Sequence, residues 1–223
     1  MATRKLERKY YFSVEGETEK WYLEWLQKQI NTTPQSSYKV SFVIKVQKDP
    51  MKFIKSVTIT EKTEMWHLSD YESDEPIHVK QFHETMEQLK KAKKSGKHIS
   101  YFFGYSNLTF DLWMVLHKSD CNTHLNHRSH YLRLLNRAYG TQFEDMHQYK
   151  HEDQFSRCLQ KLQLADVLSA IRRAIVIMER NNQNGYILQE YCGYRYYKEN
   201  PSLEIWKPIA KILSDCNLYH SAT

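Results

Sequence analysis

The first half of the chain alternates between short apolar runs of strand type and amphipathic helical patterns, and this alternation limits the possible folds most strongly. Apolar or alternating runs occupy residues 10–14, 38–46, 65–68 and 98–103, and a helical pattern follows each of them. Repeated strand and helix segments predict βαβ units with right-handed crossovers. The sequence therefore predicts an α/β fold with a mostly parallel four-stranded sheet flanked by helices.

The second half of the chain has mainly helical patterns. We expect residues 1–118 to form the α/β core and residues 119–223 to form a helical C-terminal part packed on it. Asn184-Gly185 ends the strongest helix, and the last helix is expected to begin at Pro201-Ser202. The helical patterns of this half cover residues 128–139, 154–161, 164–182 and the stretch that follows Pro201.

Composition excludes several classes of protein and leaves the partner open. The 223 residues carry 32 Lys plus Arg against 26 Asp plus Glu, a net charge of +6 that permits a nucleic-acid partner without requiring one. The four cysteines form no CxxC pair, so neither a zinc ribbon nor a disulfide framework is expected. The chain shows no signal-peptide core and no apolar run long enough to span a membrane, so we expect a cytoplasmic protein without a membrane partner.

The first strand pattern ends in an acid, a glycine and the start of a helix. Glu15 follows Val14 directly, so it is expected at the carboxyl edge of the sheet, where open α/β sheets place their ligands. We expect Gly16 to allow a sharp turn and Thr18 to cap the helix. The alternative is an ordinary helix start, because acids suit the positive end of a helix.

A second strand pattern also ends in acids. Asp70 and Glu72 lie two residues apart just after the strand, and both could contact one hard cation. Carboxylates with retained water molecules are the ligands that Mg²⁺ prefers, and a bound cation could polarise a phosphodiester. Glu15 could complete the metal shell or relay a proton. The alternative is a solvated acidic loop.

A third candidate site is rich in histidine. Cys121, His124, His127 and His130 could ligate zinc, but steps of three residues on a loop do not match the usual paired spacing. A polar loop that covers the neighbouring apolar helix is the favoured interpretation.

Asp111 lies at the start of an almost wholly apolar helix. A buried charge requires a partner, so we expect Asp111 to face the acidic site through a metal ion, a water molecule or a basic side chain such as Lys150. Lys150 could in turn neutralise a scissile phosphate, although an ordinary surface lysine fits the sequence equally well. The alternative for Asp111 is exposure in the first helical turn.

These motifs together resemble the Toprim domain as it occurs in RloB-like proteins, over nearly the whole chain. The sequence Val14-Glu15-Gly16-Glu17-Thr18-Glu19 matches the first motif of the family, and Ser69-Asp70-Tyr71-Glu72 stands where D-x-D belongs. The segment Ser106 to His117 resembles S-N-P-x-F-E-x-W-x-x-x-H, with Leu108 for Pro and Asp111 for Glu. Tyr149-Lys150 and Asn200-Pro201-Ser202 also resemble family features.

The resemblance implies a Toprim-like (Rossmann-like) fold and a function. The implied protein is a metal-dependent nuclease-like effector that cleaves tRNA or DNA in anti-phage defence, with Mg²⁺ or Mn²⁺ as cofactor. The partners so implied are nucleic acid and an ATPase encoded nearby, and a homo-oligomer is also left open. The alternative is a non-catalytic Toprim subunit that binds or regulates in an ATPase-containing defence complex. The residues assigned by this resemblance are Glu15, Asp70, Glu72 and Lys150 for catalysis, and Glu15, Asp70, Glu72, Glu19 and Asp111 for metal binding.

Overall fold

The central sheet has five strands in the order β2-β1-β3-β4-β7, and the first four are parallel. The computed structural model describes residues 5–95 and 98–220. The predicted α/β class, the mostly parallel sheet and the helical C-terminal part are confirmed. The strands are β1 (Glu7–Val14), β2 (Lys39–Val46), β3 (Thr63–Asp70), β4 (Ile99–Asn107) and β7 (Ser202–Leu203).

Alternation along β1 explains why the sheet is buried on both faces. Phe12 and Val14 lie in one hydrophobic core, whereas Tyr11 packs against a second core. Ser13 shares the face of Tyr11 and hydrogen bonds to Tyr101 over 2.7 Å. Because successive side chains of a strand point to opposite faces, this pattern requires a covering layer on each side.

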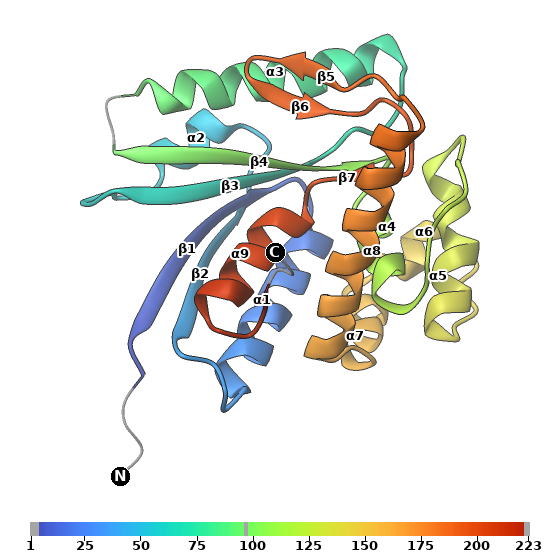
Figure 1. The fold of residues 1–223 in the computed structure, drawn as a ribbon, viewed down its shortest axis with the longest axis horizontal. Coiled ribbons are helices and arrows are strands. Elements are labelled where there is room, and N and C mark those ends of the chain that lie inside the picture. Colours follow the sequence, from blue (N-terminus) through green and yellow to red (C-terminus); the bar gives the residue numbers. More distant parts are fainter. Residues whose placement is uncertain (1–4, 96–97, 221–223) are drawn as a thin grey trace.

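Two layers cover the opposite faces of the sheet (Figure 1). Their cores are separate, one built around large side chains such as Tyr22 and Trp113, and the other around Phe82 and Tyr105. The first layer contains α1 (Glu17–Thr32), α4 (Asp111–Lys118), α8 (Leu164–Gln183) and α9 (Trp206–Asp215). The second contains α2 (Pro50–Lys55), α3 (Pro76–Lys93) and a hairpin of β5 (Gln189–Tyr191) and β6 (Tyr194–Tyr196).

The fifth strand corrects the prediction for residues 201–203. Ser202 and Leu203 do not begin the last helix but pair antiparallel with Asn107 and Ser106 at the end of β4. The backbone N–H of Glu204 also donates to the carbonyl of Tyr105 over 2.8 Å. These residues satisfy backbone groups that the edge of β4 would otherwise leave unpaired, so the helix starts only at Trp206.

Short helices lie beyond the carboxyl ends of the parallel strands, where Figure 1 shows α5 and α6. Asn107 at the end of β4 donates to the carbonyls of Tyr197 and Lys198 over 3.2 and 2.7 Å, which fixes the segment after the hairpin. Within residues 5–95 and 98–220, no helix has the length and apolar character to cross a membrane. The short helices are η1 (Arg128–His130), α5 (Tyr131–Tyr139), α6 (Met146–Tyr149) and α7 (Glu152–Gln160).

Candidate active site at the carboxyl edge of the sheet

Two neighbouring parallel strands bring the first acids together. Val14 at the end of β1 pairs in register with Leu68 of β3, so Glu15 emerges beside Ser69. The hydroxyl of Ser69 donates a hydrogen bond to the Glu15 carboxylate. Asp70 is the last residue of β3. The strand pattern predicted that Glu15, Asp70 and Glu72 share one edge of the sheet, and the structure places them there.

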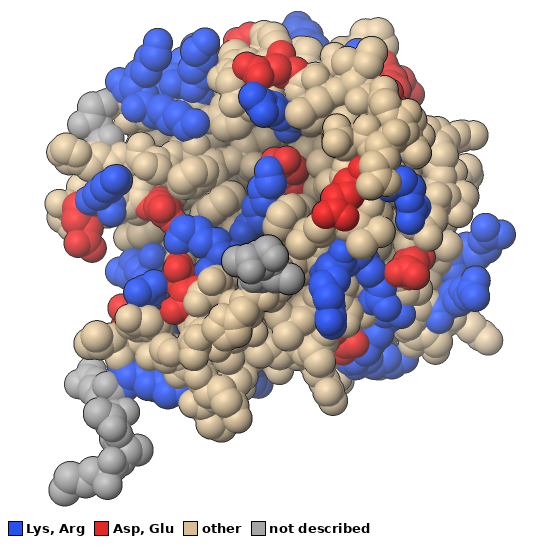
Figure 2. Space-filling view, viewed as in Figure 1, with Lys and Arg blue, Asp and Glu red and all other residues tan. Residues whose placement is uncertain are grey.

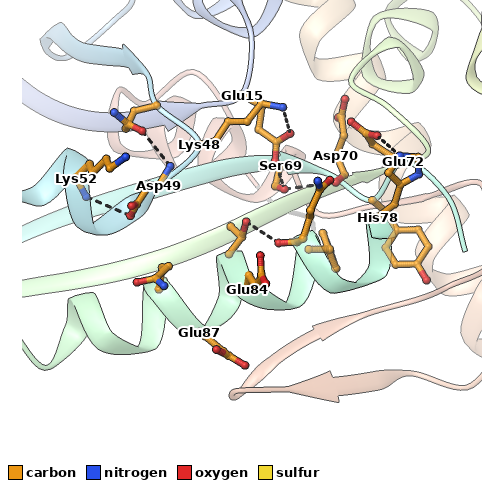
Figure 3. Close-up of a pocket in the computed structure, with 16 residues that line it drawn as sticks. Glu15, Lys48, Asp49, Lys52, Ser69, Asp70, Glu72, His78, Glu84 and Glu87 are labelled. Atoms are coloured by element: carbon orange, nitrogen blue, oxygen red, sulfur yellow. Dashed lines mark hydrogen bonds and ion pairs between the residues drawn. The ribbon is translucent and has the colours of Figure 1, made fainter. Parts of the chain in front are cut away.

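A cleft of about 610 Å³ opens at this edge, between the sheet, α2 and α3. Figure 3 shows the acids of the β1 and β3 ends along one side of it, and Glu84 and Glu87 of α3 on the other. The cleft is wide enough to admit a polar ligand to Asp70. Its lining at the strand ends consists of Glu15, Gln47, Lys48, Asp49, Ser69, Asp70, Tyr71 and Glu72.

Gly16 and Glu19 correct the expected helix start. Gly16 is the N-cap residue of α1 with an extended backbone, φ −142° and ψ 172°, and no side chain caps the helix. The hydroxyl of Thr18 instead donates to Oε2 of Glu19 over 2.7 Å. A Cβ at Gly16 would lie 3.1 Å from the same Oε2. Gly16 therefore leaves room for the buried Glu19 carboxylate that packs against it, and its own backbone angles do not require glycine.

Asp70 lies at the centre of the acidic group. Burial raises its pKa well above the usual value, and the nearby carboxylates of Glu19, Glu15 and Asp111 raise it further, while Lys150 opposes them. Burial likewise raises the pKa of Glu19, against the hydrogen bond from Thr18 and the charge of Lys150. These groups come from β3, α1, the β1 end, α4 and the segment after α6. The edge therefore concentrates negative charge where the strands end.

Asp111 is buried at the start of α4, as predicted, and contacts Lys150, one of the three partners that the sequence left open. Its side chain is only 1% exposed, and Nζ of Lys150 lies 3.6 Å from its Oδ2. Thr109 donates to the same Oδ2 over 3.2 Å, whereas Oδ1 is buried without a hydrogen-bond partner among the described residues. Burial raises the pKa of Asp111, and Lys150 and Thr109 lower it. The alternative of a solvent-exposed Asp111 is wrong.

Glu72 contacts two basic side chains. Nε2 of His78 lies 3.1 Å from its Oε2, and Nη1 of Arg128 lies 3.9 Å from its Oε1. The backbone of Glu72 is left-handed, with φ 60°, an uncommon conformation for glutamate. The turn therefore directs this carboxylate toward α3 and η1.

The donor atoms fit a hard divalent cation in type. Carboxylate oxygens with retained water suit Mg²⁺ and Mn²⁺, and Oδ1 of Asp111 and Oγ of Ser106 are buried without a partner in the described chain. Ser106 lies opposite Asp70 in the register of β3 and β4. Within residues 5–95 and 98–220, however, no three Asp, Glu, His or Cys side chains converge closely enough to bind one ion directly. The acids that would hold the cation are Glu15, Glu19, Asp70 and Asp111.

The histidine-rich run forms no zinc site in the described part of the chain. Cys121 is buried, whereas His124 and His127 are exposed and hydrogen bond to Asn200 and Ser129 respectively. The segment instead leads into η1 and α5 beside the acidic edge.

Three basic side chains at the edge were not predicted as site residues. Nζ of Lys48 lies 3.8 Å from Oε2 of Glu15, and His78 and Arg128 hold Glu72. Lys48 follows the end of β2, so the rule that located Glu15 would also have located Lys48. No local pattern indicated His78 or Arg128, because their contacts depend on the packing of α3 and η1.

Glu15→Gln is expected to stabilise the metal-free protein at alkaline pH and not at acidic pH. Burial raises the pKa of Glu15 to about 7, aided by Glu19 and Glu72 and opposed by Ser69 and Lys48. The pKa of a glutamate in the unfolded chain is about 4.3. Because the folded protein binds the proton of Glu15 more tightly, this group contributes its full stability below about pH 4.3, and the contribution is lost as the pH rises through about 7. Glutamine keeps an acceptor for Ser69 without the charge.

Thermal and urea unfolding in EDTA at pH 5 and pH 8 would measure this effect. We expect nearly equal stabilities at pH 5 and an advantage of about 1–3 kcal/mol for the glutamine variant at pH 8. A variant that is less stable than wild type at pH 8 would show that Lys48 and Ser69 stabilise the Glu15 carboxylate more than burial destabilises it.

The fold and this edge define an α/β protein with a carboxylate-rich site at the ends of parallel strands, where a partly exposed lysine contacts a buried aspartate. The family model described as RloB-like protein matches residues 10–212, and the chain belongs to that family. Comparisons with curated proteins and with solved structures gave no match.

Proposed function

We propose that this protein is a divalent-metal-dependent nuclease with a Toprim-like site, which cleaves tRNA or DNA as an effector of anti-phage defence in the cytoplasm. The observation that carries the proposal is that Glu15, Glu19, Asp70 and Asp111 lie near one another at the carboxyl edge of the sheet, with Lys150 beside Asp111. Buried acids with raised pKa values are destabilised as anions, and a divalent cation relieves that cost. The family match over residues 10–212 supports the same interpretation.

Each residue has a separate part in the proposed reaction. Mg²⁺ or Mn²⁺, when bound, would supply charge stabilisation for a phosphodiester and its leaving oxygen. Asp70 and Asp111 would bind the cation at the edge, and Glu19, buried in the first turn of α1, would support them. Lys150 is half-exposed, so its ammonium group can reach an anionic phosphate while it contacts Asp111.

Glu15 is the residue best suited to proton transfer. Its pKa of about 7 in the metal-free site lies near physiological pH, which suits a general acid or base. Ser69 holds one carboxylate oxygen by a hydrogen bond, and Lys48 lies beside the other. The carboxylate also lines the cleft, so a substrate or water molecule can reach it.

A second function is favoured by the conformation of Glu72. This acid is engaged by His78 and Arg128, as expected if the protein is a non-catalytic subunit that binds or regulates an ATPase. Alternatively, the ATPase partner that the family resemblance implies would activate the nuclease by changing this turn. Both alternatives predict that the isolated chain is inactive.

Cleavage assays with labelled tRNA and DNA distinguish these functions. The purified protein would be incubated with Mg²⁺, Mn²⁺ or EDTA, with and without the neighbouring ATPase. The nuclease proposal predicts metal-dependent products that EDTA abolishes, at least when the ATPase is present. The absence of cleavage under every condition would favour the non-catalytic subunit.

A further inference from the structure

The exposed side of η1 and α5 carries a line of arginines, here called the basic stripe: Arg128, Arg133 and Arg137. Tyr131, Leu135 and Tyr139 of α5 are buried, so the helix presents Arg133 and Arg137, one turn apart, to solvent. Arg128 is also exposed, with 56% of its side chain accessible. The stripe therefore consists of Arg133 and Arg137 on one face of α5 and of Arg128, which is exposed at the start of η1.

The basic stripe begins at the acidic site. Nη1 of Arg128 lies 3.9 Å from Oε1 of Glu72, and its charge lowers the pKa of Asp111. The hydroxyl of Tyr131, the first residue of α5, donates to the carbonyl of Asn107 at the end of β4 over 3.4 Å. Figure 1 shows α5 beyond the ends of the parallel strands, and Figure 2 shows blue side chains along the same outer edge. The stripe thus leads outward from the site.

Arg133 and Arg137 are not neutralised within the described chain. Neither forms an ion pair within 4.0 Å with another described residue, and α5 contains no acidic residue. Other arginines and lysines are compensated, for example Arg173 by Asp120 and Lys118 by Asp166. An uncompensated row of guanidinium groups is the arrangement that binds phosphates.

We propose that the basic stripe binds the phosphate backbone of the nucleic acid and guides it into the acidic edge. This inference rests on the proposed function, because it names the surface by which that site would hold its substrate. Arg137 follows Arg128 by nine positions, about 15 Å along η1 and α5 at rises of about 2.0 Å per residue in a 3-10 helix and about 1.5 Å in an α-helix. Duplex DNA carries one charge per about 1.7 Å of axis, so the stripe can face several phosphates.

A nucleic acid fits the basic stripe better than an acidic protein does. Protein interfaces generally have an apolar centre with aromatic anchors. The large apolar side chains exposed in the described chain lie on other elements, for example Val176 on α8 and Ile187 before β5, and none lies on η1 or α5. A charged face without an apolar centre suits a phosphate backbone, whose binding is mainly electrostatic.

The test removes two charges from the stripe and leaves the acidic site intact. The variant Arg133→Gln/Arg137→Gln would be compared with Lys90→Gln/Lys91→Gln, which removes the same charge from exposed positions near the end of α3. Binding would be measured by fluorescence anisotropy in EDTA, with a labelled RNA stem-loop and a labelled DNA duplex across a range of salt concentrations. Thermal melts would verify that both variants fold.

The stripe variant is expected to bind on the order of tenfold more weakly, and the slope of log affinity against log salt should flatten by about two. The α3 variant should bind within about twofold of wild type. If the stripe variant loses more affinity for the RNA stem-loop than for the DNA duplex, or the reverse, the nucleic acid with the larger loss is the preferred ligand of the stripe.

The failures of the two proposals are distinguishable. If wild type cleaves nucleic acid and the stripe variant binds as wild type does, the stripe proposal is wrong and the nuclease proposal stands. If wild type binds through the stripe but never cleaves, the nuclease proposal is wrong and the stripe proposal stands. Polyglutamate bound as tightly as nucleic acid, with the same loss in the stripe variant, would overturn the assignment of the stripe to nucleic acid.

Discussion

Asp70→Asn is expected to abolish metal-dependent cleavage while the metal-free protein stays at least as stable as wild type at pH 7.5. Burial and the surrounding carboxylates raise the pKa of Asp70, so its charged form opposes folding. Asparagine keeps the shape and removes the charge that a cation requires. Activity should fall more than about 100-fold. Loss of a residue that only hydrogen bonds to a metal ligand usually reduces activity by about 10- to 100-fold, so a larger loss indicates direct metal binding.

The experiment combines a cleavage assay in Mg²⁺ with a thermal melt in EDTA. Glu84→Gln is the matched control, because Glu84 is an exposed carboxylate on the opposite wall of the same cleft. The control should keep its activity. Full activity with asparagine at position 70 would remove Asp70 from the catalytic site, and a large loss of stability would show that its carboxylate has a structural role.

Lys150→Met is expected to reduce both cleavage and stability. It removes the ammonium group 3.6 Å from a carboxylate that is 1% exposed. Burial lowers the pKa of Lys150, but Asp111, Asp70 and Glu19 outweigh it and raise the pKa above the ordinary value. Breaking a fully buried pair costs about 3–5 kcal/mol, and the 39% exposure of Lys150 reduces our expectation to about 1–3 kcal/mol.

A double-mutant cycle separates the two effects. Asparagine at position 111 needs no cation, so Lys150→Met/Asp111→Asn should recover most of the stability but none of the activity. Lys20→Met, at an exposed ion pair with Glu17, is the control and should cost less than about 0.5 kcal/mol. Additive losses in the cycle would show that Lys150 and Asp111 do not stabilise each other.

The sequence predicted the sheet because strands that are buried on both faces must consist mostly of apolar residues, which appear as short apolar runs. The apolar runs before Glu15 and Asp70 located two neighbouring strand ends, and a parallel sheet brings such ends to one edge. Burial also predicted that Asp111 requires a partner, and Lys150, one of the partners left open by the sequence, contacts it. Local chemistry was sufficient in these cases.

The features that the sequence did not predict depend on contacts between segments that are far apart in the chain. β7 has two residues and β5 and β6 have three each, too short for a periodic signal, and their pairing depends on β4 and on each other. The direction of Glu72 depends on a left-handed turn and on His78 and Arg128 from other elements. Gly16 leaves room for the Glu19 carboxylate, a contact that the sequence did not predict, and its own backbone angles do not require glycine.

Anomalous diffraction from crystals soaked in Mn²⁺ tests the central claim most directly, because it locates the cation without relying on activity. The nuclease proposal predicts a manganese peak at the carboxyl edge among Glu15, Glu19, Asp70 and Asp111, and its loss in Asp70→Asn crystals. Wild-type crystals with no peak at this edge at millimolar Mn²⁺, or a peak that persists unchanged in Asp70→Asn, would contradict it.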